Sequence, residues 1–325
     1  MTEITDNIVE SFPATLAKPW ASAPGSRLAS RRRHSHPDDP AGRWAPPGAW
    51  IAIALLISPH VSPWTSMWLL AIAIFAACKW ATWWPYRFHP TATPARHAAF
   101  LFAYAGMDAE AFYLGPPAPA PRRREWIVTV ARALTGAAMI ATAARLTFPA
   151  HPMLSAWLTM IGLVLLLHFG LLDLLALAWR GRGINAQPLM RRPTAAKSLA
   201  DFWGRRWNTG FSALARDFLF EPLRRTTSPI VATAAVFLAS GVVHDLVISL
   251  PARGGYGGPT LYFLIQFAGL SLERTHTLRR ALARHALLGR VFTIAVIVAP
   301  LPLLFHVTFI RNVILPFLTT FGGLS

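Results

Sequence analysis

Long apolar runs separated by short arginine-rich clusters are the feature that most restricts how this chain can fold. The runs at residues 64–84, 153–179 and 229–250 are each long enough, as helices, to cross the ~30 Å hydrocarbon core of a bilayer. Backbone N–H and C=O groups find no water there, so a spanning segment must satisfy them within the protein. The sequence therefore predicts an all-α polytopic integral membrane protein.

Composition and charge agree with that class. Hydrophobic residues make up 54% of the chain and charged residues 14%, and the 13 tryptophans are typical of membrane interfaces. The formal net charge of +17 would suggest nucleic acid in a soluble protein. Here the basic clusters lie between apolar runs, so we expect them to face anionic membrane lipids and expect no nucleic acid. The single cysteine, Cys78, excludes an intrachain disulfide framework and a cysteine-cluster metal site.

Two regions are predicted from the distribution of polar residues. Residues 1–47 are rich in Pro, Ser and Arg and are expected to form a disordered cytoplasmic tail. Residues 48–325 are expected to form one transmembrane domain with about 7–8 spanning helices plus interfacial or re-entrant helices. The run at 49–60 is short for a span and favours a tilted, half-inserted or hairpin segment. Asp108 and Glu110 make residues 85–125 a poor lipid-facing span, so an interfacial or buried segment is expected there.

An ionisable pair lies inside the run at 229–250. His244 and Asp245 are costly in a lipid-spanning helix and are a functional-site hypothesis for that reason. His244 lies about 22 Å along the helix from its predicted cytoplasmic start. A buried neutral imidazole suits general-base catalysis. A buried histidine bonded to a neighbouring helix is the alternative, and composition alone favours it.

A second pair, His168 and Asp173, has the spacing H-x4-D within an apolar run. Five residues turn a helix by about 140°, so these side chains diverge. We therefore expect hydrogen bonds to neighbouring helices and not catalysis from this pair.

The segment FWGRRWN precedes the run with His244. Trp203 and Trp207 are four residues apart and share one face if the segment is helical. Arg205 and Arg206 would then point toward headgroups or a phosphorylated ligand. Asn208 can donate and accept hydrogen bonds, as an orienting or oxyanion-binding group must. An amphipathic surface helix with anchoring Trp and snorkelling Arg is the alternative interpretation.

Together, FWGRRWN, EPLRR and SGVVHD resemble the wax synthase-like branch of the membrane-bound O-acyltransferases (MBOAT). The segments HFGLLDLLALAWRGRG, AGMDAEAF and RNVILPFL extend the resemblance over most of residues 85–320. Residues 160–250 carry its most specific part. Asp245 follows the histidine where plant wax synthases commonly have Glu, and the chain is short for this superfamily.

The resemblance implies acyl transfer from acyl-CoA to a hydroxyl acceptor such as a long-chain alcohol, a sterol or a terpenoid. It maps the general base onto His244 and a residue that positions the thioester onto Asn208. Trp203, Arg205, Arg206, Trp207 and Asp245 are expected to bind substrate, with the arginines on the CoA side by charge. It implies no metal and no tightly bound cofactor, with acyl-CoA as co-substrate.

The alternatives are a proton-coupled transporter or lipid-binding membrane protein that uses His244–Asp245 as a relay, and an enzyme of this fold that has lost activity. The basic clusters predict that residues 85–125, 180–228 and 273–285 lie in the cytoplasm with the N-terminus. We expect a multi-pass protein of a bacterial inner membrane. The sequence predicts no oligomeric state.

Overall fold

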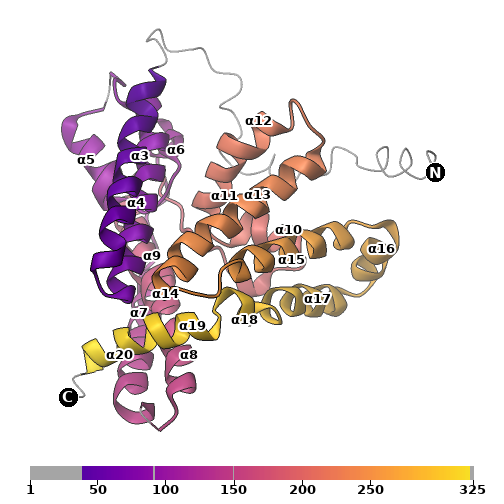
Figure 1. Cartoon of the computed structure of the whole chain (residues 1–325). Helices are drawn as coiled ribbons and strands as arrows, with labels where there is room; N and C mark the ends of the chain where they lie inside the picture. Colours follow the sequence, from indigo (N-terminus) through magenta and orange to yellow (C-terminus); the bar gives the residue numbers. More distant parts are fainter. Residues whose placement is uncertain (1–38, 91, 149, 323–325) are drawn as a thin grey trace.

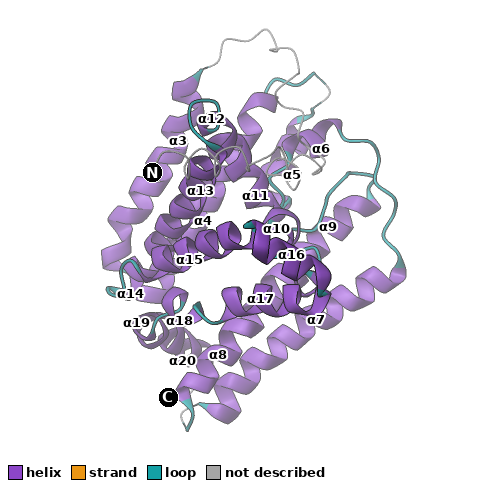
Figure 2. Cartoon of the chain, turned by 90° about the vertical axis from the view of Figure 1, so that its right-hand side faces the viewer, coloured by secondary structure: helices purple, strands orange, loops and turns teal. Residues whose placement is uncertain are grey.

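A computed structural model describes residues 39–90, 92–148 and 150–322, and within them all regular secondary structure is helical (Figures 1 and 2). Five of these helices are long and apolar enough to cross a membrane, as expected of an all-α polytopic membrane protein. They are Pro63–Tyr86, Arg123–Arg145, Pro152–Gly181, Pro229–Ala252 and Leu287–Leu304. Shorter helices include α15 (Gly258–Glu273) and the apolar stretch Val307–Thr320.

The chain begins with a helical hairpin of α3 (Pro40–Ile57) and α4 (Pro63–Trp83), as one interpretation of residues 49–60 predicted. The tail boundary at residue 47 is wrong, because α3 already begins at Pro40. The Asp39 side chain accepts a hydrogen bond from the N–H of Gly42 at 3.0 Å, and a proline after such a cap is a helix start signal. Trp80 Nε1 donates to the carbonyl of Gly42 at 3.1 Å and fixes this start on α4. Residues 1–38 of the predicted tail lie outside the described residues.

Between the candidate spans that end at Tyr86 and begin at Arg123, the described residues form two short helices, α5 (Pro94–Ala103) and α6 (Ala109–Leu114), and no further candidate span. The prediction of a short segment buried in protein is confirmed for their inner faces, which pack an aromatic cluster against the end of α4. Lys79, which is 1% exposed, extends from α4 into this cluster and donates from Nζ to the carbonyl of Gly106 at 2.7 Å. The loop before α6 is thereby fixed to a spanning helix.

Helix α7 (Arg123–Thr142) packs closely on a long helix made of α8 (Pro152–Leu163), the π-helical segment η5 (Val164–Leu171) and α9 (Leu172–Gly181). A Cβ on Gly136 would lie 2.6 Å from the carbonyl oxygen of Gly162, so the backbones touch there. His168 Nδ1 and Asp173 Oδ1 are buried without a hydrogen-bond partner. The bonds to neighbouring helices predicted for this pair are therefore not found at these two atoms. At this level α7 contacts the long helix through Ala133 against Gly170 and through Arg132, which lies 5.9 Å from the centre of the Phe169 ring.

The central core lies between the segment that follows residue 198 and two spanning regions. Helix α13 (Pro229–His244) packs along α15 (Figure 1), and their inner faces share a core with Leu199, Trp203 and Phe309. The other helices from residue 199 onward are α10 (Leu199–Asp201), α11 (Thr209–Ala215), α12 (Glu221–Leu223), α14 (Leu250–Ala252), α16 (His276–Arg284), α17 (Ala286–Val298), α18 (Leu301–Leu304), α19 (Val307–Phe309) and α20 (Leu315–Gly322).

Short π-helical segments interrupt this region at the predicted motifs. The segment η7 (Phe202–Arg206) carries FWGRR, η8 (Arg216–Phe220) follows α11, and η9 (Asp245–Ser249) begins directly after His244. Single π-turns within helices occur frequently at functional sites, because they shift the direction of neighbouring side chains. Two of the three fall on the stretches that the sequence singled out.

Candidate active site

His244 is the last residue of α13 and is half-buried. Its Nδ1 lies 2.7 Å from the carbonyl oxygen of Ser240, one turn earlier in the helix. A carbonyl oxygen only accepts, so Nδ1 carries the proton and the neutral ring keeps a lone pair on Nε2. This is the tautomer in which Nε2 can act as a base.

Phe263 on α15 brings the two predicted motifs together. Its ring lies 4.5 Å from the His244 ring and 5.7 Å from the Trp203 ring, centroid to centroid. Trp203 also packs edge-on against Phe237 of α13 at 5.9 Å. Trp203 and His244, 41 positions apart in the chain, thus meet on one phenyl ring, although nothing in the local sequence marks Phe263 as their common contact.

Asn208 begins α11. Its backbone is left-handed, with φ of 43°, a conformation that asparagine tolerates better than most residues. Its Oδ1 accepts from the N–H of Phe211 at 3.4 Å as the helix cap. The side-chain amide nitrogen, Nδ2, is therefore the group with which Asn208 can donate to a ligand.

In the rest of FWGRRWN, the aromatic residues pack against one another and the two arginines pair with Asp201. The π-helix ends at Arg206 and Trp207 is extended, so Trp203 and Trp207 do not form the predicted shared helical face. Trp207 stacks on Phe202 at 5.5 Å instead. Arg206 bonds the buried Asp201 at 2.6 Å, whereas Arg205 is 53% exposed and lies 3.2 Å from the same carboxylate.

Asp245 accepts hydrogen bonds from three residues. The backbone N–H groups of Gly257 and Thr260 donate at 2.9 and 3.1 Å, the Ser249 hydroxyl donates at 2.8 Å, and the Thr260 hydroxyl is a fourth donor. Gly257 is the N-cap of α15. The carboxylate therefore sits on the N-terminal end of α15, where the helix dipole favours negative charge.

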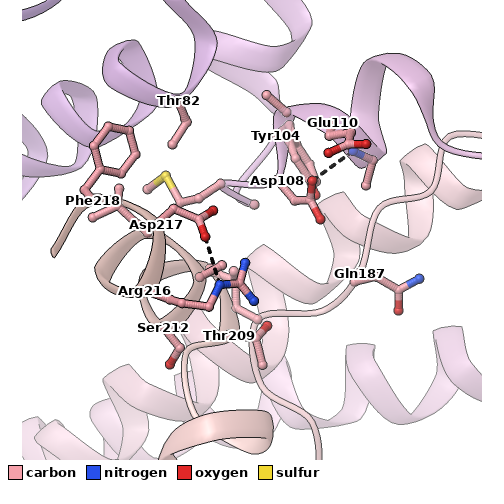
Figure 3. A pocket seen from close by; sticks show the side chains of 18 of the residues that line it. Thr82, Tyr104, Asp108, Glu110, Gln187, Thr209, Ser212, Arg216, Asp217 and Phe218 are labelled. Atoms are coloured by element: carbon pink, nitrogen blue, oxygen red, sulfur yellow. Dashed lines mark hydrogen bonds and ion pairs between the residues drawn. The ribbon is translucent and has the colours of Figure 1, made fainter. Parts of the chain in front are cut away.

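A cavity of about 200 Å³ lies beside the motif segment (Figure 3). Arg205 lines it, and its charged lining residues together are Arg43, Asp108, Glu110, Arg191, Arg205, Arg216 and Asp217. Arg216 is 4% exposed and bonds Asp217 at 2.8 Å (Figure 3). Adjacent Arg and Asp in the sequence resemble a solvated charge pair, so only the fold identifies them as cavity residues.

Asp108 lies at the edge of this cavity and caps α6, accepting from the N–H of Ala111 at 2.8 Å (Figure 3). Burial raises the pKa of its carboxyl, and the charges of Glu110 and Asp217 act in the same direction. Among the described residues, no group of three or more His, Cys, Asp or Glu side chains is placed to hold a metal ion.

Residues 186–265, which contain both motifs, match the "Membrane bound O-acyl transferase family". "Probable long-chain-alcohol O-fatty-acyltransferase 7" of Arabidopsis thaliana is 33% identical over 143 residues, 40% of this chain and 42% of that protein. "Acyl-CoA--sterol O-acyltransferase 1" of the same plant is 35% identical over 77 residues, 22% of each chain. The aligned part thus spans about two fifths or less of these relatives. In this region the chain is therefore similar to the membrane-bound O-acyltransferases, and its apolar helices fit a membrane protein.

Proposed function

We propose that this protein transfers an acyl group from acyl-CoA to a hydroxyl acceptor inside the membrane. The observation that carries the proposal is the packing of His244 and Trp203 on the single ring of Phe263. It brings a histidine suited to act as a base next to the segment that ends at Asn208. The similarity to a probable long-chain-alcohol O-fatty-acyltransferase and to an acyl-CoA–sterol O-acyltransferase supports this reaction class.

The proposed chemistry is direct transfer. Nε2 of His244 takes the hydroxyl proton as the acceptor oxygen attacks the thioester carbonyl. The new C–O bond forms a tetrahedral oxyanion, which Nδ2 of Asn208 stabilises. The C–S bond then breaks, the carbonyl reforms, and the imidazolium returns its proton to the departing CoA thiolate. The ester and free CoA are the products.

The cavity beside Arg205 is the proposed binding site for the phosphate-bearing part of the donor. Arg191, Arg205 and Arg216 line it, and guanidinium groups bind phosphate oxygens with paired hydrogen bonds. We place this face in the cytoplasm, where acyl-CoA is found, because residues 180–228 are strongly basic. The relatives named above are plant proteins, so a bacterial inner membrane stays a prediction from the sequence.

A lipophilic alcohol is the proposed acceptor. Val242 and Val243, which precede His244, are 47% and 37% exposed on a helix that is apolar enough to span the membrane. An acceptor dissolved in the bilayer can therefore approach the histidine along an apolar surface. Asp245 is engaged at the end of α15, which argues against its use as a proton relay with His244.

The test uses purified protein in lipid nanodiscs, labelled acyl-CoA and a panel of long-chain alcohols and sterols. We expect His244→Ala to lower the transfer rate by about 10²–10⁴-fold. The matched control is His276→Ala, at an exposed histidine in α16, which should transfer normally. Transfer that survives in His244→Ala contradicts the general-base role.

Asn208 is tested with an aspartate. Asn208→Asp keeps the oxygen acceptor that caps α11 but removes the amide donor. A folded variant with a rate lowered by about 10²-fold or more supports the oxyanion role. An unchanged rate limits Asn208 to its helix cap. Protein that binds neither acyl-CoA nor alcohol, yet moves protons across the bilayer, would favour the transporter alternative.

A further inference from the structure

A carboxylate bonds each end of helix α15 to another part of the site. One end is bonded to the segment that leads into FWGRRWN and the other to the segment that follows His244. At the C-terminus of α15, Glu273, which is 9% exposed, accepts a hydrogen bond at Oε2 from the N–H of Leu199 at 2.5 Å. Leu199 is the first residue of α10, which leads directly into FWGRRWN. The 74 residues between these partners make this a tertiary contact and not a local cap.

The charge of Glu273 is in an unfavourable place for α15 itself. A helix C-terminus carries partial negative charge, so an acidic residue there destabilises its own helix. At the N-terminus of α10, the same carboxylate meets partial positive charge and a free N–H. The position of Glu273 is thus explained by the helix that it caps, which is the one that carries the motif.

At the other end, Asp245 holds the first turn of α15 through Gly257 and Thr260. Asp245 directly follows His244, so the same short segment supplies the candidate base and the clamp on α15. The backbones of α13 and α15 also touch there, because a Cβ on Gly241 would lie 2.6 Å from the Cα of Thr260. The end of α15 cannot move without moving this segment.

We propose that α15 is a strut that sets the position of His244 relative to Asn208, and that Glu273 and Asp245 are the positioning residues at its ends. This inference rests on the proposed acyl transfer. The strut is a continuous helix of 16 residues, about 24 Å long, with Phe263 contacting both motifs along its length. A helix transmits a shift at one end to the other, so each clamp affects the whole catalytic arrangement.

The expected consequence is kinetic. A base and an oxyanion donor held on separate segments must keep their relative position, and an error of about 1 Å lowers a rate about 10²-fold. Glu273 lies far along the strut from the His244 ring and Asp245 is bonded to protein donors. Neither needs to touch substrate, so their removal should lower kcat and leave the KM for acyl-CoA nearly unchanged.

The experiment compares Glu273→Gln, Asp245→Asn and the double variant in nanodiscs, below the unfolding temperature of each protein. We expect each single variant to lower kcat at least fivefold with the donor KM changed less than twofold. Glu221→Gln, at a partly exposed glutamate of α12 that pairs with Arg224, is the matched control and should behave as wild type. A raised KM with unchanged kcat would overturn the positioning role.

The double variant tests whether the two residues act through one element. Sites this far apart usually act independently, so their separate effects multiply. If both act through the strut, the double variant should lose clearly less than the product of the single losses. A full product would overturn the inference. If Glu273→Gln does not fold, Ser198→Ala removes a hydroxyl that bonds the Glu273 carboxylate at the same end of α15 and takes its place. Inactive wild-type protein would instead count against the proposed function.

Discussion

Phe263 lies against His244 with a distance of 4.5 Å between ring centroids, and this contact fixes the side of the imidazole that faces the core. The phenyl ring is 5% exposed and belongs to the central hydrophobic core. Because the Nδ1–H of His244 is bonded to Ser240, the ring is held by one hydrogen bond and one packed face. The direction in which Nε2 of His244 points therefore depends on Phe263.

Phe263→Ala should affect both stability and catalysis. Truncation of a buried phenylalanine costs about 3–5 kcal/mol through lost burial and a remaining cavity. It also frees the His244 ring to rotate, so kcat should fall even at temperatures where the variant is folded. Thermal unfolding in detergent and acyl-transfer kinetics measure the two effects. Phe102→Ala is the matched control, because Phe102 is 88% exposed, and it should change neither quantity. Normal kcat in folded Phe263→Ala would contradict the packing argument.

The sequence was sufficient for the fold class and for the regions of the site. Apolar run lengths predicted the helical membrane fold, and the hairpin that α3 and α4 form is one of the three alternatives that the short run at 49–60 left open. The free-energy cost of placing His244 in a membrane span pointed to a segment that packs against the FWGRRWN motif. These features depend on local length and polarity, which can be read from consecutive residues.

Contacts between distant residues were not predictable in this way. Glu273 bonds Leu199 across 74 positions, and alone it resembles one more charge in a basic connector. The π-turn that ends at Arg206 separates Trp203 from Trp207, and helical spacing does not reveal such a turn. Asp39 was counted with the polar tail because residues 1–47 are rich in Pro, Ser and Arg, although Asp39 and Pro40 together start a helix. Tertiary packing decided each of these cases.

Arg205 and Arg206 should differ in what they control. Arg205 lines the cavity and is half exposed, so its ion pair with Asp201 adds little stability. Arg205→Ala should raise the KM for acyl-CoA about tenfold with a small change in unfolding temperature. Raising the salt concentration should weaken donor binding more in wild type than in this variant.

Arg206→Ala should instead lower stability. Its Nε bonds the buried Asp201 at 2.6 Å and its Nη1 reaches the carbonyls of Arg191 and Arg192. Each lost hydrogen bond to a buried charged group costs about 1.5–3 kcal/mol. The buried Asp201 carboxylate would also lose the positive charge that pairs with it. Differential scanning calorimetry of Arg205→Ala and Arg206→Ala measures their unfolding temperatures and distinguishes the two variants. Equal effects on donor KM and on unfolding temperature would contradict this division.

Asp108 should make stability depend on pH. Its pKa is raised in the folded protein, mainly by burial, so the folded state binds a proton more tightly than the unfolded state does. Stability should therefore be highest below the ordinary aspartate value of about 3.9 and fall as the pH rises through the raised value. Asp108→Asn removes this loss but keeps an oxygen that caps α6. Its unfolding temperature should change less with pH than that of wild type.

Asp108→Ala is the control for the helix cap. It also removes the ionisable group, but it loses the bond to Ala111, which costs about 0.5–2 kcal/mol at all pH values. The asparagine and alanine variants should therefore show parallel pH profiles, with alanine lower. If the unfolding temperatures of wild type and Asp108→Asn changed equally with pH, ionisation of the Asp108 carboxyl would not be what destabilises the folded protein.

Gly136 should tolerate no side chain, because α7 and the long helix Pro152–Gly181 touch there through their backbones. A Cβ on Gly136 would lie 2.5 Å from the nitrogen of Leu166 and 2.6 Å from the oxygen of Gly162, and backbone atoms cannot rotate aside. Gly136→Ala should destabilise the protein by about 1–3 kcal/mol through overpacking. Gly48→Ala in α3 is the matched control, since nothing lies within 4 Å of the added Cβ. That variant should be neutral or stabilised by up to about 1 kcal/mol, because alanine favours helices more than glycine does. Unfolding temperatures in detergent separate the two expectations, and equal shifts would mean that the α7 contact has room for a methyl group.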